Sequence, residues 1–142
     1  MSESSDPQTT VLEIIAEEIY LETVAKFIEN TLESAVFPDD AEMKIFSVKL
    51  SIHEACVNII EHAYKGLPGP IRLEVTLDRI SKKVQLDLYD QGAPAHLDEI
   101  NPPNLDKPQI KGYGLFLMQQ LMDSVDYFHE SGTNHWRLVK QL

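Results

Sequence analysis

Two segments in the middle of the chain alternate between apolar and polar residues and are separated by only four residues. They are IRLEVTL at 71–77 and KKVQLDLYD at 82–90, with DRIS between them. Alternation with a period of two places the apolar side chains on one face of a strand, and so short a connection joins antiparallel neighbours. The pair therefore predicts a β-hairpin with one buried face, which must be covered by other elements of the chain.

The rest of the chain supplies such elements, grouped rather than alternating with the strands. This grouping is typical of an α+β fold and not of a parallel α/β sheet. At 142 residues the chain is long enough for one domain with a core. We expect a disordered tail at 1–8 and one domain at 9–142, containing a strand at 9–16, helices at 17–36 and 41–64, a short helix at 113–125, and closing strands at 125–130 and 135–142.

Composition narrows the functional classes. The 12 basic and 23 acidic residues give a formal net charge of −11, which disfavours direct binding to nucleic acid phosphates. The single cysteine, Cys56, excludes an intramolecular disulfide and fits a reducing compartment. No apolar run approaches the length of a membrane span, and MSESSDPQTT does not resemble a signal peptide. We therefore expect a cytoplasmic protein with an inert, buried Cys56 thiol.

The helix at 41–64 carries a polar stripe. Glu54, Asn58 and His62 follow one another at four-residue steps, which places them on one helical face among apolar neighbours. A carboxylate can act as a general base, and an asparagine oxygen can bind Mg²⁺ beside phosphates. The pattern suits activation of a nucleophile next to a metal-bound phosphate. Taken alone, an ordinary solvated helix face is the more frequent explanation.

A zinc site is a poorer explanation of the same helix. In HEACV the position that a zinc protease motif requires to be a second histidine is Val57. His53 and Cys56 remain a weak metal pair, and packing explains them more simply.

Three later stretches carry weaker signals. Asp90 and Gly92 in LYDQGAP suit either a turn or recognition of an exocyclic amine such as that of adenine. Gly112 and Gly114 in KGYGLFLM open a helix whose first N–H groups can meet an anion, with Lys111 beside them. In SGTNHW, Thr133 or Asn134 can bond a ligand ring or simply form a turn. Between the first two stretches lie about twenty residues, 91–112, with four prolines, which suggests a functional lid or a disordered loop.

The order of these signals is more specific than any one of them. HEACVNIIEHAY, DQGAP, GYGLFLMQQLMDSVDY and GTNHWRLVK resemble the N, G1, G2 and terminal boxes of the GHKL ATP-binding superfamily. Within it the chain is most similar to the bacterial anti-sigma factor serine/threonine kinases of partner-switching systems. The resemblance implies a two-layer Bergerat sandwich, with a mixed, mostly antiparallel sheet and helices on one face.

The resemblance also implies roles for individual residues. Glu54 takes the place of the general base, Asn58 that of the magnesium ligand, and Asp90 that of the adenine-recognising aspartate. The further nucleotide contacts that it implies are His62, Gly92, Lys111, Gly112, Gly114, Leu115 and Thr133.

The function implied is an ATP- and Mg²⁺-dependent protein kinase. It would phosphorylate a STAS-domain anti-anti-sigma protein and sequester a sigma factor. Relatives commonly dimerise, so we expect a homodimer. The alternative is a nucleotide-binding module that regulates a partner without phosphotransfer.

Overall fold

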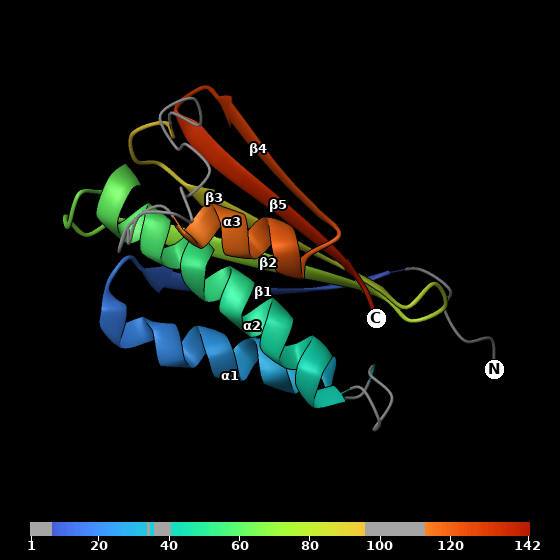
Figure 1. Cartoon of the computed structure of the whole chain (residues 1–142). Helices are drawn as coiled ribbons and strands as arrows, with labels where there is room; N and C mark the ends of the chain where they lie inside the picture. The colour runs from blue at the N-terminus through green and yellow to red at the C-terminus, as the bar shows by residue number, and fades with distance from the viewer. Residues whose placement is uncertain (1–6, 34, 36–40, 96–112) are drawn as a thin grey trace, which may run out of the picture.

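The computed structural model describes residues 7–33, 35, 41–95 and 113–142 (Figure 1). Its centre is a five-stranded sheet in the order β1-β2-β3-β5-β4, in which all the strand pairs are antiparallel. The strands are β1 (Gln8–Ile15), β2 (Pro70–Asp78), β3 (Lys83–Asp90), β4 (Ser124–Glu130) and β5 (Thr133–Gln141). The helices are a 3₁₀ turn at Glu18–Tyr20, α1 (Leu21–Leu32), α2 (Ala41–Asn58), a π turn at Ile59–Ala63, and α3 (Tyr113–Leu121).

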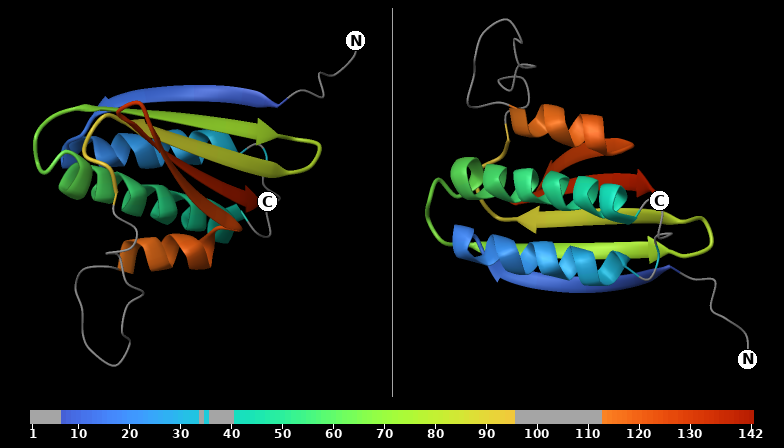
Figure 2. Two further views of the ribbon diagram at one scale, coloured as in Figure 1. Left: turned by 90° about the horizontal axis from the view of Figure 1, so that it is seen from above. Right: turned by 60° about the horizontal axis from the view of Figure 1, so that its bottom comes forward.

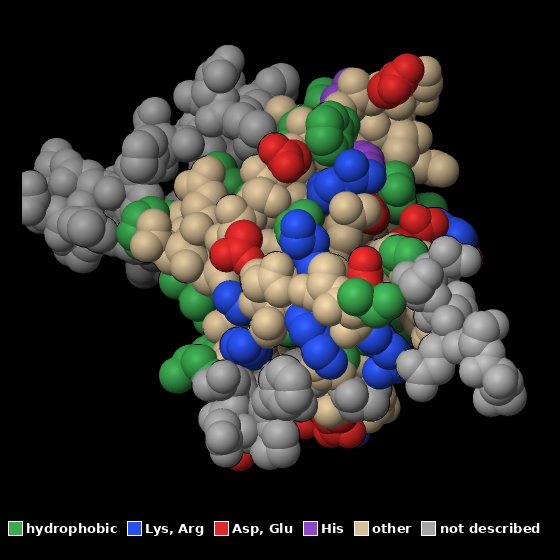
Figure 3. Space-filling model, turned by 90° about the vertical axis from the view of Figure 1, so that its right-hand side faces the viewer, with side chains coloured by type: hydrophobic (Ala, Val, Ile, Leu, Met, Phe, Trp, Pro, Cys, Tyr) green, Lys and Arg blue, Asp and Glu red, His purple; other side chains and the backbone are tan. Residues whose placement is uncertain are grey.

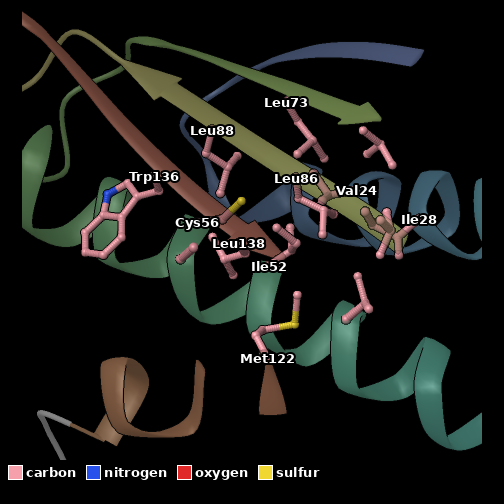
Figure 4. Close-up of a cluster of buried hydrophobic side chains, with 14 of the residues drawn as sticks. Val24, Ile28, Ile52, Cys56, Leu73, Leu86, Leu88, Met122, Trp136 and Leu138 are labelled. Atoms are coloured by element: carbon pink, nitrogen blue, oxygen red, sulfur yellow. The ribbon is translucent and has the colours of Figure 1, made fainter. Parts of the chain in front are cut away.

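The fold has two layers. Figures 1 and 2 show α1, α2 and α3 side by side on one face of the sheet, with α2 between the other two. The strand alternation explains this arrangement: Leu73 and Val75 of β2, and Leu86 and Leu88 of β3, are buried, whereas the residues between them face away from the helices. Figure 4 shows Leu73, Leu86 and Leu88 of these strands facing Ile28, Ile52 and Cys56 from the helices. The predicted α+β sandwich with helices on one face is therefore confirmed.

Two details differ from the expectation. The described sheet is antiparallel throughout, whereas a mixed, mostly antiparallel one was expected. In addition, β1 begins at Gln8, which pairs with Leu77, so the first strand starts inside the predicted tail. Residues 1–6 of that tail lie outside the described residues.

The helix predicted to run to Tyr64 is α-helical only as far as Asn58. The Tyr64 N–H then donates to the carbonyl of Ile59, five residues back, at 2.9 Å, which is the bond of a π turn. A π turn widens the helix and changes the angle between successive side chains. The four-residue spacing therefore places Glu54 and Asn58 on one helical face, but it is a poorer guide to the direction of the His62 side chain.

The closing strands begin earlier than predicted. The third helix ends at Leu121, β4 starts at Ser124, and Thr133 already pairs with Glu130. The two-residue turn between these strands, Ser131–Gly132, has positive φ at both positions (52° and 79°), the conformation that fits the twist of a tight hairpin. Thr133 therefore belongs to a strand, and strand alternation decides which way its side chain points.

Charge is unevenly distributed over the acidic chain. Figure 3 shows several lysine and arginine side chains gathered at the end of the molecule that carries the β2–β3 connection, to which Arg79 and Lys82 belong. The end of β3 that carries Asp90 is the opposite one. Within the described residues, no helix is long and apolar enough to cross a membrane.

Candidate nucleotide-binding site

The first part of the site is formed where α2 faces the start of α3. A Cβ placed on Gly114 would lie 3.1 Å from Glu54 Oε2 and 3.5 Å from Asn58 Nδ2. The two polar side chains of α2 therefore reach the same backbone position at the beginning of α3. Because Gly114 has no side chain, the carboxylate and the amide can pack closely against its backbone.

His62 does not belong to this pair in the same way. It lies in the π turn, its side chain is 68% exposed, and its Nε2 is 4.0 Å from Glu61 Oε2. The structure thus brings Glu54, Asn58 and Gly114 together and places His62 at the surface beyond them.

The second part of the site is Asp90, the last residue of β3. Asp90 is only 1% exposed. Its Oδ1 accepts from the N–H of Gly92 (2.9 Å) and from the side-chain amide of Asn134 (2.8 Å). Its Oδ2 is also buried and has no hydrogen-bond partner among the described residues. Burial raises the pKa of this carboxyl, and the bonds from Asn134 and Gly92 and the charge of His129 counteract only part of that rise.

Asn134 holds Asp90 in place. Its Nδ2 donates to Asp90 Oδ1 and also lies 3.1 Å and 3.0 Å from the carbonyl oxygens of Gly92 and Ala93. Its Oδ1 accepts from the Tyr127 hydroxyl and lies 2.8 Å from His129 Nδ1. One buried amide therefore fixes both the orientation of the carboxylate and the backbone that follows it.

Thr133, which the resemblance placed near the ring of the nucleotide, lies on the other face of the sheet. It lines a shallow depression there, together with Tyr89, Phe128, Glu130, Ser131 and His135. Asn134 has the same strand parity as the buried residues Trp136 and Leu138. That parity is the sequence signal that distinguishes Asn134 from Thr133.

The two parts of the site are joined by backbone contacts that the sequence did not reveal. The Ala93 N–H donates to the carbonyl of Ala63 in the π turn at 2.8 Å. A Cβ on Gly92 would lie 2.5 Å from that same carbonyl group, so only glycine fits without a shift. Next to this contact, the Tyr64 hydroxyl donates to the carbonyl of Pro70 (2.6 Å) and accepts from the N–H of Gln91 (2.9 Å). The end of the α2 segment and the end of β3 therefore form one joint.

The remaining predicted residues have other outcomes. Leu115 is half-buried against the core, while Lys111 and Gly112 lie outside the described residues. Among the described residues there is no cluster of three metal-binding His, Cys, Asp or Glu side chains. Cys56 is fully buried, and burial raises the pKa of its thiol to about 12, so it is a packing residue rather than a poised ligand.

The donor set fits an adenine nucleotide with Mg²⁺. The buried, unpartnered Asp90 Oδ2 can accept from an exocyclic amine, and Glu54 and Asn58 bring a carboxylate and an amide oxygen close to Gly114 at the start of α3. Mg²⁺ takes few protein ligands when phosphates and waters complete its shell, so an acidic cluster is not required.

Comparison with known proteins identifies the family of the chain. Residues 14–140 match the family described as the histidine kinase-like ATPase domain. The chain belongs to this family. The match spans α1, α2, α3, β2, β3, β4, all but the last residue of β5 and only the last two residues of β1, so it includes both parts of the site.

Curated relatives include the serine-protein kinases RsbW of Bacillus mycoides and Bacillus thuringiensis. Each is 30% identical over 102 residues, which cover 66% of this chain and 60% of the relative. The chain thus matches about three fifths of the length of these ATPase-family kinases. The predicted resemblance to the GHKL superfamily, and within it to anti-sigma factor kinases, is confirmed at the level of the family.

Solved structures support the fold. The RsbU and RsbW domains of a Mycobacterium tuberculosis protein superpose with a TM-score of 0.66 at 18% identity, covering 95% of this chain and 32% of that one. The histidine kinase domain of a blue-light activated kinase from Erythrobacter litoralis gives a TM-score of 0.54 at 14% identity, covering 87% and 60%. At these identities the likeness concerns the ATPase-domain fold.

Proposed function

We propose that this chain is a serine/threonine kinase that uses ATP and Mg²⁺ to phosphorylate a STAS-domain anti-anti-sigma protein. One observation carries the proposal: Glu54 and Asn58 both reach the backbone of Gly114, and a hydrogen-bonded joint connects their helix to a buried carboxylate with an unpartnered oxygen. These are the two requirements of a phosphotransfer site, a place for the base and phosphates and a place for the nucleotide ring.

The ring would be held by Asp90. With Oδ1 occupied by Asn134 and Gly92, the ionised carboxylate presents Oδ2 to the amino group of adenine. A buried acceptor without a partner costs free energy, so a ligand that donates to it gains the hydrogen bond and removes that cost. A guanine ring presents an acceptor at the equivalent position, and we therefore expect selectivity for ATP over GTP.

The transfer itself would occur beside Gly114. Bound Mg²⁺, held by Asn58 Oδ1 and the phosphates, would neutralise charge on the triphosphate. Glu54 would accept the proton of the acceptor hydroxyl while the oxygen of that hydroxyl bonds to the γ-phosphorus. The bond from the γ-phosphorus to the β,γ-bridging oxygen breaks, and ADP leaves with that electron pair. Glu54 and Asn58 lie one helical turn apart, so the proton acceptor and the metal ligand would lie beside the same phosphate group.

The wider role follows the partner-switching scheme. We propose that the chain sequesters a sigma factor when its STAS partner is phosphorylated, acts as a homodimer, and works in the cytoplasm, where ATP is available as the phosphoryl donor. The names of the RsbW relatives support the kinase part of this scheme.

The test is a comparison of the wild-type chain with Glu54→Gln and Asp90→Asn. ATP binding is measured by calorimetry with and without Mg²⁺, and transfer of labelled phosphate is measured to a purified STAS-domain protein. Glu54→Gln should bind ATP but lose transfer by roughly a hundredfold or more, the usual contribution of a general base. Asp90→Asn should lose binding.

Two results would contradict the proposal. Transfer by Glu54→Gln at the wild-type rate would remove Glu54 as the base. Binding of ATP by the wild-type chain without any transfer would favour a nucleotide-dependent interaction module.

A further inference from the structure

The outer face of α2 carries apolar side chains that face solvent. Met43 is 72% exposed and Phe46 is 57% exposed, while Leu50 and Val57 are half-buried. Steps of three, four and seven residues place these four on one side of the helix, opposite the buried Ile45, Val48 and Ile52. We call the set Met43, Phe46, Leu50 and Val57 the outer α2 stripe.

The neighbouring helices leave this stripe uncovered. Figure 2 shows α2 between α1 and α3. The side of α2 toward α1 is marked by the ion pair of Lys49 with Glu29, at 3.6 Å, and the side toward α3 by the contact of Glu54 and Asn58 with Gly114. The outer α2 stripe lies between these two sides. Exposed large apolar residues in helical register are unusual on a surface that contacts only water.

The outer α2 stripe runs directly past the proposed base. Leu50 is four residues before Glu54 and Val57 is three residues after it, so both are its neighbours on the helix surface. A protein that brings a hydroxyl to the Glu54 carboxylate must cover these two positions. Phe46 and Met43 continue the same surface by one and two turns toward the start of α2.

Two carboxylates lie near the Val57 end of this face, which also carries the exposed His53. Glu61 follows Val57 by four residues, in the π turn, and about half of its side chain is exposed. With Glu54 it places two carboxylates at the Val57 end of the stripe, on a chain with a net charge of −11. A partner that covers this end without a basic residue would leave the two carboxylates without a compensating positive charge.

We propose that the outer α2 stripe is the docking surface for the phosphoacceptor protein, which covers Met43 and Phe46 with an apolar patch and carries a basic residue beside the acceptor hydroxyl. This inference rests on the proposed kinase function and adds the place and chemistry of substrate recognition. Phe46 is the anchor, because it is the one aromatic residue of the stripe, it lies between Met43 and Leu50, and large aromatic side chains contribute most to such interfaces.

The experiment uses the full chain and the STAS-domain protein offered to it in the assay above. Phe46→Ala and Met43→Ala should each raise the KM for that protein, Phe46→Ala by roughly tenfold, and leave ATP affinity unchanged. The matched control is Phe128→Ala, which removes a phenylalanine of similar exposure (47%) from the opposite face of the sheet. It should leave the KM for the STAS protein unchanged. Glu61→Lys should also raise this KM and weaken its dependence on salt.

The outcomes separate the two proposals. Wild-type transfer with an unchanged KM in Phe46→Ala overturns the docking surface and leaves the kinase function standing. The docking surface is equally overturned if Phe128→Ala raises the KM as much as Phe46→Ala, or if Glu61→Lys has no effect. A wild-type chain that binds ATP but transfers no phosphate defeats the kinase function, and the docking surface with it, before any α2 variant is compared.

Discussion

The orientation of Asp90 depends on Asn134, and replacing that one side chain tests the proposed nucleotide pocket most directly. Asn134→Ala removes an amide that is only 1% exposed and that contacts Asp90, Gly92, Ala93, Tyr127 and His129. Asp90 Oδ1 then keeps only the N–H of Gly92, and the Tyr127 hydroxyl loses its acceptor. A buried polar group left without a partner costs about 1–3 kcal/mol.

Asp90 and Tyr127 each lose one hydrogen bond but keep another, to Gly92 and Ala95, and a small cavity is left beside them. We therefore expect the free energy of unfolding to fall by about 2–4 kcal/mol. ATP affinity should fall by roughly tenfold, or about 1.4 kcal/mol, because Asp90 Oδ2 is no longer held in one position. The pKa of Asp90 should also rise further, since the loss of the Asn134 bond removes a contact that lowers it.

The assays are urea unfolding followed by circular dichroism and ATP titration by calorimetry. The matched control is Thr133→Ala, one residue earlier, whose side chain lies on the opposite face of the sheet. It should change the unfolding free energy by less than about 0.5 kcal/mol and leave ATP affinity unaltered. If Thr133→Ala weakened ATP binding and Asn134→Ala did not, the assignment of Asn134 to the pocket would be refuted.

Three further predictions concern the joint, the core and pH. Gly92→Ala places a Cβ 2.5 Å from the backbone of Ala63 and should lower the unfolding free energy by about 1–3 kcal/mol, as measured by urea titration. An unchanged unfolding free energy would mean that the backbone at this joint shifts without cost. Cys56 should resist a thiol reagent such as Ellman's in the native chain and react once urea unfolds it, because burial raises the pKa of its thiol to about 12; rapid native labelling would contradict its burial. ATP affinity should fall as pH is lowered through the raised pKa of Asp90, since only the ionised carboxylate accepts from adenine, and calorimetry at several pH values checks this. The same raised pKa makes the contribution of Asp90 to folding stability decrease as pH rises through that window, because the folded chain binds the proton more tightly than the unfolded one.

Much of the architecture was readable from short-range patterns. Alternation at 71–77 and 82–90 predicted the central hairpin, and the apolar spacing from Val24 to Leu32 predicted the first helix, because both patterns record which face is buried. The family followed from the order of four motifs. The strand and helix patterns depend on residues that are close in the sequence, and the motifs depend on residue types that the chemistry of such a site requires.

The features that could not be predicted depend on contacts between distant segments. Nothing in IIEHA distinguishes a π turn from a continued α-helix, because the change is stabilised by the bond of Ala63 to Ala93, thirty residues away. The choice between Thr133 and Asn134 needed the exact start of β5. The roles of Glu54, Asn58 and Asp90 remain predictions, now with a geometry that brings the first two together.

The π turn has a consequence for how this domain tolerates changes in length. A π turn, closed by a bond five residues back, holds one residue more than the α-helical turn that it replaces. Deleting one residue between Ile59 and Ala63 should therefore restore a regular α-helical turn at this end of α2 without unfolding the helical layer of the domain. It would, however, offer a different carbonyl to Ala93 and move Tyr64 away from Gln91. A deletion of Ile60 or Glu61 would thus separate the helix that carries Glu54 and Asn58 from the strand that carries Asp90 without removing any of these three side chains.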